Sequence, residues 1–284
     1  SVYWTVGTAG PSDATAGQHY VMLRVASVGS GSKGNATLVA SEETTLLIDC
    51  GFPAREMLSR LDLLNVDISD VDAILVTHEH SDHVEGVVAV SKAAGAPIYA
   101  THGTMKSGKL DGARSMVEIE SDSEFAIGDI EVSAVTVPHD AKEPVQYVFK
   151  HLAQRVGVLT DLGMVSPHVL LAYEGCDLLL LEFNHDLAML WRGPYPAALK
   201  HRVSGDFGHL NNDQALGMLE AMGDSLPGTV IAGHISEQNN SVGAVASLLS
   251  PLIQRTKMNV IYATQSQGFN WVSSDSSGVV SKVA

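Results

Sequence analysis

Short apolar runs, separated by polar turns, recur along the chain. Runs of this kind that end in Gly, Pro, Ser, Asn or Asp are typical of buried β-strands. The pattern predicts a strand-rich core. The predicted strands lie at residues 22–28, 35–40, 45–49, 73–76, 97–100, 116–120, 124–127, 130–137, 145–150, 156–160, 177–183, 229–232, 258–263 and 268–272.

Longer stretches between these runs predict helices. Pro53 begins the first of them, at a first-turn position where the missing N–H costs nothing. Asn211 or Asn212 is the expected cap of a later helix. Strands and helices in one chain, with a hydrophobic content of 45%, favour a globular α/β protein. The predicted helices span 53–65, 84–94, 167–173, 186–202 (two pieces broken near Gly193-Pro194), 213–222 and 238–252.

One domain is expected, because no clear linker interrupts the middle of the chain. We place this domain at residues 21–272. Residues 1–20 are rich in Gly, Ser, Thr and Ala and are expected to form a flexible extension. The serine-rich residues 273–284 are expected to form a flexible tail, and residues 101–115 to be irregular.

Charge and composition argue against two classes of function. The net charge of −15, with only 17 Lys and Arg residues, disfavours a generally basic surface for nucleic acids. No apolar run reaches the ~18 residues of a membrane span. Cys50 and Cys176 are expected to be buried free thiols rather than a disulfide or ligands. No basic-then-apolar leader opens the sequence, and we expect a cytoplasmic protein.

The stretch T-H-E-H-S-D-H, from Thr77 to His83, carries the strongest chemical signal. It follows the apolar run 73–76 directly, so a strand ends where these side chains begin. His78 and His80 are two residues apart and project the same way, while Asp82 and His83 could reach a second metal position. Imidazole and carboxylate are the natural ligands of Zn²⁺ and related ions. The alternative is a polar surface turn that happens to be rich in histidine.

Further metal-competent residues follow other predicted strands, which brings the total to seven. A single His139 or Asp161 would more often be structural, so the prediction of a metal centre depends on the whole set. Two cations ~3.5–4 Å apart lower the pKa of a bridging water and clamp a phosphoryl group. The set predicts two divalent ions, with zinc expected and manganese as the alternative. One ion takes His78, His80 and His139, the other takes Asp82, His83 and His234, and Asp161 bridges them.

In these motifs the chain resembles the metallo-β-lactamase superfamily, whose hallmark H-x-H-x-D-H matches His78 to His83. More narrowly, it is similar to the WalJ/YycJ (VicX-like) group. The resemblance covers about residues 22 to 272 and implies a four-layer αβ/βα sandwich with the metals at the edge between two sheets. The group is described as metal-dependent phosphodiester hydrolases, with exonuclease activity on DNA attributed to some. The other matching stretches are 27–35, 137–141, 159–163, 182–186, 208–212 and 233–236.

Two motifs also resemble the tRNA-processing branch of that superfamily. By this likeness His209 contacts a phosphate oxygen or protonates the leaving oxygen, and Glu182 orients a histidine. Asp82 is a second candidate for handling a proton. His185 and Asn184 are candidate substrate contacts. The alternative for His209 is a plain histidine in the turn before a helix.

Several histidines and one loop carry weaker signals. We expect His19, His151, His168 and His201 to be surface histidines without a role. The glycine-serine loop 27–35 is either an anion-holding loop or a plain hairpin loop.

Three functions compete at this point. The first is a phosphodiesterase or nuclease that attacks phosphorus with a metal-bridging hydroxide. The second is a β-lactam, amide or ester hydrolase on the same scaffold, and Asp161 disfavours it because lactamases of the superfamily usually lack this bridging residue. The third is a metal-stabilised binding protein, which would not require seven convergent ligands. The sequence leaves the substrate open between DNA ends, RNA ends and a small phosphodiester, and it leaves the oligomeric state open. Candidate contacts to a phosphate backbone are Lys33, Lys106, Lys109, Arg114, Arg192, Lys200 and Arg202.

Overall fold

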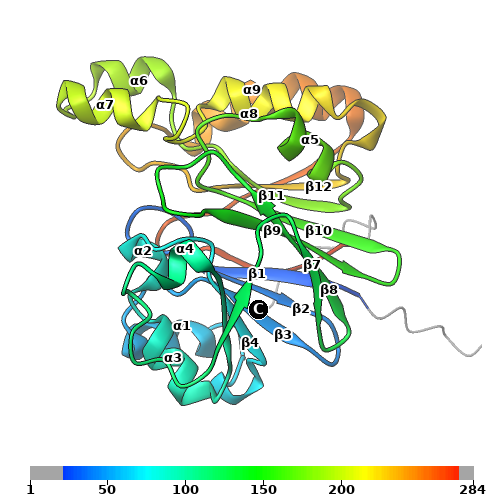
Figure 1. Cartoon of the computed structure of the whole chain (residues 1–284). Helices are drawn as coiled ribbons and strands as arrows, with labels where there is room; N and C mark the ends of the chain where they lie inside the picture. The colour runs from blue at the N-terminus through cyan, green and yellow to red at the C-terminus, as the bar shows by residue number, and fades with distance from the viewer. Residues whose placement is uncertain (1–21, 275–284) are drawn as a thin grey trace, which may run out of the picture.

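Two mixed β-sheets lie face to face in the middle of the molecule (Figure 1). The structure is a computed structural model that describes residues 22–274. The predicted extension at 1–20 lies outside the described residues. The predicted tail at 273–284 also lies outside them, apart from Ser273, which ends the last strand, and Ser274.

The first sheet joins the two ends of the described chain. Its order is β14-β1-β2-β3-β4-β5-β6, antiparallel from β14 to β3 and parallel from β3 to β6. The last strand therefore pairs with the first. The strands are β1 (Arg24–Gly29), β2 (Ala36–Ala40), β3 (Thr45–Ile48), β4 (Ala73–Leu75), β5 (Ile98–Thr101), β6 (Met116–Ile119) and β14 (Phe269–Ser273).

The second sheet has the order β13-β12-β11-β10-β9-β8-β7. It is antiparallel from β7 to β10 and parallel from β10 to β13, so the carboxyl ends of β10, β11 and β12 share one edge. The strands are β7 (Glu124–Ile127), β8 (Ile130–Thr136), β9 (Val145–His151), β10 (Gln154–Leu159), β11 (Leu178–Glu182), β12 (Thr229–Gly233) and β13 (Asn259–Tyr262).

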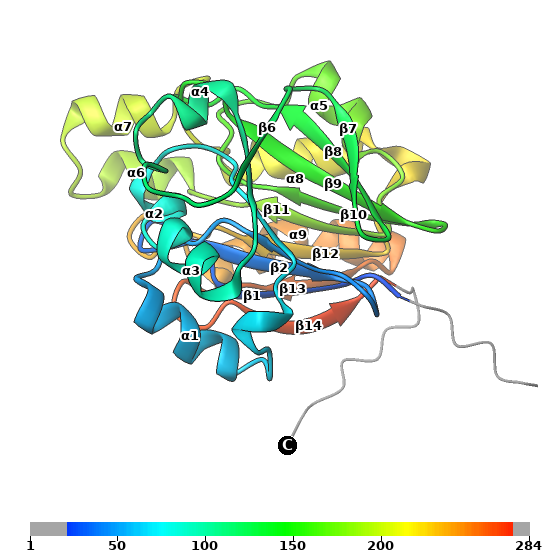
Figure 2. The same ribbon diagram turned by 60° about the horizontal axis from the view of Figure 1, so that its bottom comes forward.

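Helices cover the outer face of each sheet, while a helical hairpin formed by α6 and α7 extends from one end (Figures 1 and 2). In Figure 1, α1 and α3 lie outside the first sheet, and α5, α8 and α9 lie outside the second. This is the predicted four-layer α/β sandwich. The helices are α1 (Ala54–Asp62), α2 (Ser81–Val84), α3 (Val87–Ala94), α4 (His102–Met105), α5 (Pro167–Tyr173), α6 (Leu187–Arg192), α7 (Ala197–Val203), α8 (Asn212–Ala221) and α9 (Val242–Thr256), with single 3₁₀ turns at Ile68–Asp70 and Gly223–Ser225.

Three apolar layers hold the sandwich together. One lies between the sheets and contains Tyr147 and Phe149, and the other two lie between each sheet and its helices. Strands in the middle are therefore buried on both faces, as in β11, where all five residues of Leu178–Glu182 are buried. Double burial explains why the sequence shows continuous apolar runs rather than alternation.

Two helix predictions need correction. The helix predicted at 84–94 begins only at Val87, as α3, and a separate short helix, α2, ends at Val84, with Gly86 between them. A Cβ at Gly86 would lie 2.1 Å from the carbonyl oxygen of Phe52, so close packing of this turn requires glycine. The helix predicted from residue 238 begins only after Ser241, because Asn240 is committed to a buried hydrogen bond with the carbonyl of Phe183 at 2.8 Å.

Smaller predictions have mixed outcomes. Both cysteines are buried free thiols, as expected, and burial raises the pKa of Cys50 to about 12 and that of Cys176 to about 11. His168 and His201 are exposed, and His19 lies outside the described residues. His151 is not a surface histidine, because it is buried with Nδ1 donating to the carbonyl of Asp129 at 2.9 Å. Among residues 22–274, no helix is both long and apolar enough to cross a bilayer.

Part of residues 101–115 is regular after all. The short helix α4 begins there, with the Thr101 hydroxyl accepting a hydrogen bond from the N–H of Thr104.

We expect Tyr147→Phe to lower the free energy of unfolding by about 1–2 kcal/mol. The Tyr147 hydroxyl donates to the carbonyl of Val76 at 2.9 Å across the buried layer between the sheets, and Phe would leave that carbonyl without this partner. Urea denaturation measures the change. Tyr262→Phe is the control, because Tyr262 is only partly buried and its change should stay within about 0.5 kcal/mol. Equal stability of both variants would contradict the assignment.

Candidate metal centre

All seven predicted ligands lie in segments that follow strands. His78, His80, Asp82 and His83 follow β4 of the first sheet. The other three, His139, Asp161 and His234, follow β8, β10 and β12 of the second sheet. The centre therefore draws on both sheets at one edge of the sandwich.

Three imidazoles form the first ligand group. His78 Nε2 lies 3.0 Å from His80 Nδ1, and His139 Nε2 lies 3.3 Å from that same atom. Four ligands placed tetrahedrally around Zn²⁺ at about 2.0–2.1 Å would be ~3.3 Å apart. The spacing is thus the one that a shared cation requires, and the structure brings together the three residues predicted for the first ion.

Hydrogen bonds behind these rings fix which nitrogen carries the lone pair. The Thr77 hydroxyl gives its one proton to Asp49 at 2.8 Å, so His78 Nδ1 must be the donor in its 2.9 Å contact with that hydroxyl. His139 Nδ1 donates to the carbonyl of Gly208 at 3.1 Å. Burial lowers the pKa of both His78 and His139. Both rings are therefore neutral at pH 7 and present Nε2 lone pairs to the group.

Asp161 lies at the junction of two ligand groups. Its Oδ2 is 3.4 Å from His83 Nε2, is buried, and has no hydrogen-bond partner among the described residues. One group consists of Asp161, His78 and His83, and the other contains Asp161 with His209 and His234. A buried carboxylate oxygen without a donor fits a metal ligand. Asp82 lies at the margin of the centre, with Oδ2 3.7 Å from His83 Nε2.

Glu182 is the hydrogen-bond acceptor that organises the second side of the centre. Its carboxylate accepts from the N–H of Asp161 and the N–H of Leu210, each at 2.7 Å. It also accepts from His234 Nδ1 at 2.7 Å and His209 Nδ1 at 3.3 Å. Burial favours the neutral acid, but His209 and His234 outweigh it and lower the pKa of Glu182 to about 2. Because four donors occupy its oxygens, we treat Glu182 as an orienting residue and not as a ligand.

His234 is held by Glu182 in the orientation that a ligand needs. The hydrogen bond to Glu182 uses Nδ1 and leaves Nε2 as the nitrogen available to a cation. His234 Nδ1 is also 3.6 Å from Asp161 Oδ1, so the ring lies beside the junction carboxylate.

Only one of the three predicted substrate-side residues reaches a pocket. A pocket of about 210 Å³ opens beside the centre, and His209 lines it together with His80, Asp82 and Asp161. His185 is completely buried, so a substrate does not reach it in this structure and its predicted contact role needs correction. Asn184 is tied to the His234 carbonyl through Nδ2 at 3.3 Å and is not among the residues lining this pocket.

Three strand-end residues adopt a left-handed backbone conformation. The φ angles are 60° at Asp49, 52° at Asp161 and 53° at His234. This conformation costs about 1 kcal/mol or more in a residue other than glycine. The surrounding hydrogen bonds hold it: Ser30 Oγ accepts from the N–H of His234 at 2.9 Å. The left-handed conformation changes the direction of the chain just after each strand, where the side chains of the centre lie.

Asp49 is the residue that the sequence analysis missed. Its carboxylate accepts from the N–H of Thr77, the Thr77 hydroxyl and His83 Nδ1, each at 2.8 Å. It thereby orients His83 as Glu182 orients His234. The signal was present, because Asp49 ends an apolar strand just as Asp161 does.

The glycine-serine loop is held by hydrogen bonds to side chains inside and outside it. The N–H of Gly31 donates to Asn35 Oδ1 at 2.7 Å, and the N–H of Lys33 donates to Gln265 Oε1 at 2.9 Å. These two N–H groups are therefore not available to an anion.

We expect metal uptake at pH 7 to release protons. Burial opposes charge on both rings, but Asp161 and Asp49 raise the pKa of His83 to about 10, and Asp161 and Glu182 raise that of His234 to about 9. Both are therefore protonated in the metal-free protein at pH 7, and a metal must displace the protons. The release should vanish above pH ~10. Zinc titration calorimetry in buffers of different ionisation enthalpy measures it, and a buffer-independent enthalpy would contradict it.

We expect Asp49→Asn to weaken uptake of the second metal by about 10–100-fold. The amide keeps the shape but removes the charge that holds the His83 ring. Metal content after dialysis against graded chelator measures the effect. Asp129→Asn is a matched control, because Asp129 also contacts a histidine, His151 at 3.4 Å, and a hydroxyl, Ser41 at 2.7 Å, outside the centre. Loss of both metals in both variants would show a general folding defect instead.

Known proteins support the fold and the family. Solved structures with the same fold include the metallo-beta-lactamase fold protein YhfI from Bacillus subtilis, with a TM-score of 0.68, 17% identity and coverage of 89% of this chain and 100% of that one. Human tRNase Z, short form, gives a TM-score of 0.60 at 15% identity, covering 89% of this chain and 99% of that one.

Closer relatives are found by sequence. Exodeoxyribonuclease YycJ of Bacillus anthracis is 34% identical over 79% of this chain and 84% of its own length. Exodeoxyribonuclease WalJ of Streptococcus pneumoniae is 35% identical over 74% of this chain and 81% of its own length. Residues 44–235 match the beta-lactamase superfamily domain, and the chain therefore belongs to the beta-lactamase superfamily.

Proposed function

We propose that the protein is a dinuclear metal-dependent phosphodiesterase that removes nucleotides from nucleic-acid ends. The observation that carries the proposal is Asp161, whose Oδ2 has no hydrogen-bond partner among residues 22–274 and lies between two groups of ligand atoms. Relatives that align over most of their length are named exodeoxyribonucleases. A carboxylate shared by two cations suits displacement at phosphorus.

The donor set fits divalent cations, and we propose zinc. Three imidazole nitrogens on one side and a mixed set of His and Asp on the other favour Zn²⁺ over the oxygen-preferring ions. His78, His80 and His139 would hold one ion, while Asp82, His83 and His234 would hold the other, with Asp161 shared. When bound, the pair supplies an activated water and polarises the phosphoryl group.

The chain's own residues supply positioning and a proton. Despite burial, Glu182 raises the pKa of His209, which favours the protonated ring. Its Nδ1 is committed to Glu182, which leaves Nε2 to contact a phosphoryl oxygen or to protonate the leaving oxygen. The small pocket, about 210 Å³, accommodates one phosphodiester rather than a duplex. A reducing compartment such as the cytoplasm suits the two unpaired thiols.

We expect Asp161→Ala to abolish phosphodiester hydrolysis while the protein stays folded. The metal-replete protein is tested on single- and double-stranded DNA, on RNA, on bis(p-nitrophenyl) phosphate and on a chromogenic cephalosporin. The proposal predicts turnover of phosphodiesters and loss by a factor of a hundred or more in the variant, on the scale of metal-assisted attack. Circular dichroism checks folding. Full activity in Asp161→Ala, or turnover confined to the cephalosporin, would refute the phosphodiesterase proposal.

We expect His209→Ala to reduce kcat by about 10²–10⁴ with little loss of metal. The reason is that His209 is oriented by Glu182 but lies on the pocket side of the centre, with a side chain 23% exposed. Metal content and kcat are measured on the same sample. Loss of a metal ion in proportion to the loss of activity would reassign His209 as a ligand.

A further inference from the structure

The helical hairpin beside the metal centre has a charge opposite to that of the rest of the chain. Between Leu187 and Gly205 the sequence contains three basic residues, Arg192, Lys200 and Arg202, and no Asp or Glu. The whole chain carries a net charge of −15. This segment comprises α6 and α7, and we call it the arm. It extends beyond the helices that cover the second sheet (Figures 1 and 2).

The arm contributes to the catalytic pocket. Tyr195, Leu199 and Arg202 line the pocket of about 210 Å³ together with His80 and His209. The arm therefore forms one wall of the pocket beside the metal centre. Arg202 Nε donates to Asp140 Oδ2 at 2.5 Å, which joins the arm to the segment that carries His139.

The arm contributes little to the apolar core. In α7 no residue is buried, and in α6 only Leu190 is. Trp191 is 46% exposed, and Phe207, which follows the arm, is 62% exposed. Packing of the core therefore does not explain why the arm contains Trp191, whose ring contacts His201 of α7 and is partly exposed to solvent.

The arm is nevertheless held in a fixed shape. Lys200 Nζ in α7 donates to the carbonyl of Trp191 in α6 at 2.8 Å. In the turn between α6 and α7 a Cβ at Gly193 would lie 2.7 Å from Asn239 Oδ1, and just after the arm a Cβ at Gly208 would lie 2.2 Å from the carbonyl of Arg202. Close packing at these two points allows the arm to present its side chains in a defined arrangement.

Exposed cations and aromatic rings on one rigid element suit a single nucleic-acid strand. Backbone phosphates are bound by Lys and Arg, and unpaired bases stack on aromatic side chains. Arg192 makes no ion pair with any residue among 22–274, and Trp191 is its neighbour in sequence. An indole ring can stack only on a base that is not already stacked within a duplex.

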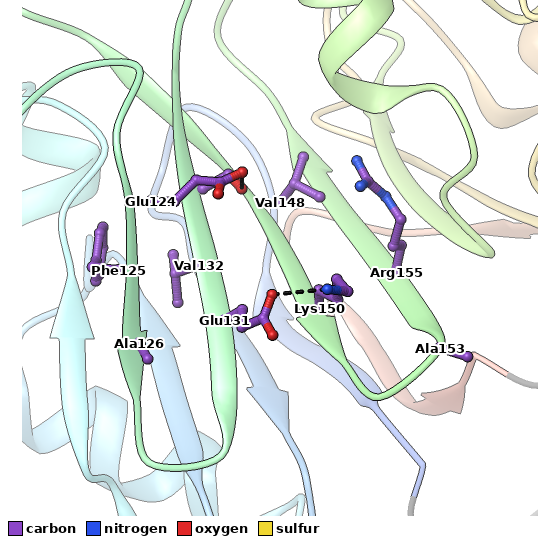
Figure 3. A pocket seen from close by; sticks show the side chains of 10 residues that line it. Glu124, Phe125, Ala126, Glu131, Val132, Val148, Lys150, Ala153 and Arg155 are labelled. Atoms are coloured by element: carbon purple, nitrogen blue, oxygen red, sulfur yellow. Dashed lines mark hydrogen bonds and ion pairs between the residues drawn. The ribbon is translucent and has the colours of Figure 1, made fainter.

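Another hollow in the molecule lacks this combination. A cavity of about 510 Å³ lies on the outer face of β7 to β10 (Figure 3). There Lys150 is paired with Glu131 at 2.9 Å, and Glu124 lies opposite Arg155 across the hollow. Its charges balance, so it offers no attraction for a polyanion.

We infer that the arm is the strand-binding element of this enzyme, which holds the backbone and a base of single-stranded nucleic acid as its end enters the metal centre. The inference rests on the proposed function for the position of the reacting phosphodiester. Strand binding by the arm can be tested apart from hydrolysis, because neither Arg192 nor Trp191 belongs to the pocket lining or to the groups of ligand atoms.

Direct binding tests the inference without any hydrolysis. Fluorescence anisotropy is measured on the metal-replete protein with labelled 12-nucleotide phosphorothioate DNA and RNA strands, which resist hydrolysis. We expect Trp191→Ala and Arg192→Ala each to weaken binding about fivefold or more. Arg192→Ala should also reduce the slope of log K against log salt by about 0.7, as expected for one lost phosphate contact. Lys92→Ala is the control, because Lys92 is an exposed cation on α3 in the opposite helical layer.

The possible outcomes separate the two proposals. Weaker binding in both arm variants but not in Lys92→Ala supports the inference, with DNA, with RNA or with both. Unchanged binding in the arm variants overturns it, even if the enzyme hydrolyses phosphodiesters. Strand binding that depends on the arm in a protein that hydrolyses no phosphodiester would uphold the inference and reject the proposed function.

A kinetic comparison adds a second test. For the metal-replete enzyme, Arg192→Ala should raise KM for the 12-nucleotide strand several-fold and leave hydrolysis of bis(p-nitrophenyl) phosphate unchanged, because the small ester occupies the pocket and Arg192 is not among the residues that line it. Equal losses on both substrates would show that the arm only supports the pocket, and this result also overturns the inference.

Discussion

The site depends on the hydrogen bonds that the buried carboxylate of Glu182 accepts. An ion removed from water costs several kcal/mol unless donors replace the lost hydration. Here the replacement comes from two backbone N–H groups and two imidazoles. Because Glu182 ends β11, between β10 and β12, satisfying its charge draws Asp161 and His234 to the same point. The electrostatic requirement of one side chain thus sets the positions of a junction ligand and its neighbour.

Asp49 has the corresponding role in the first sheet. It follows β3 and accepts hydrogen bonds from the N–H of Thr77 and from His83 Nδ1. Each sheet therefore places its own ligands through a buried acid at a strand end, and the ligands meet at the edge of the layer between the sheets. Metal ions bound there would join the two halves of the sandwich, so the fold and the metal centre stabilise each other.

Much of this arrangement could be predicted from the sequence, and the predictions that failed did so for physical reasons. Apolar runs such as 178–182 revealed the strands because burial on both faces leaves little room for polar residues. Candidate ligands such as His139 were identified because they follow those runs. Asp49 also ends an apolar strand, but it was missed because this position alone does not distinguish an acid that orients a histidine from one with no role in the centre. His185 and His151 were misjudged because their burial depends on segments far away in the chain, such as the bridge between His185 and Asn211.

The pairing of β14 with β1 has a consequence for biosynthesis. During translation β1 leaves the ribosome long before its partner Phe269–Ser273. Until then one margin of the first sheet presents unsatisfied amides, which are a template for adhesion between nascent chains. Completion of the sheet therefore waits for β14, and a chain that ends before Phe269 would keep this margin open and be prone to aggregate.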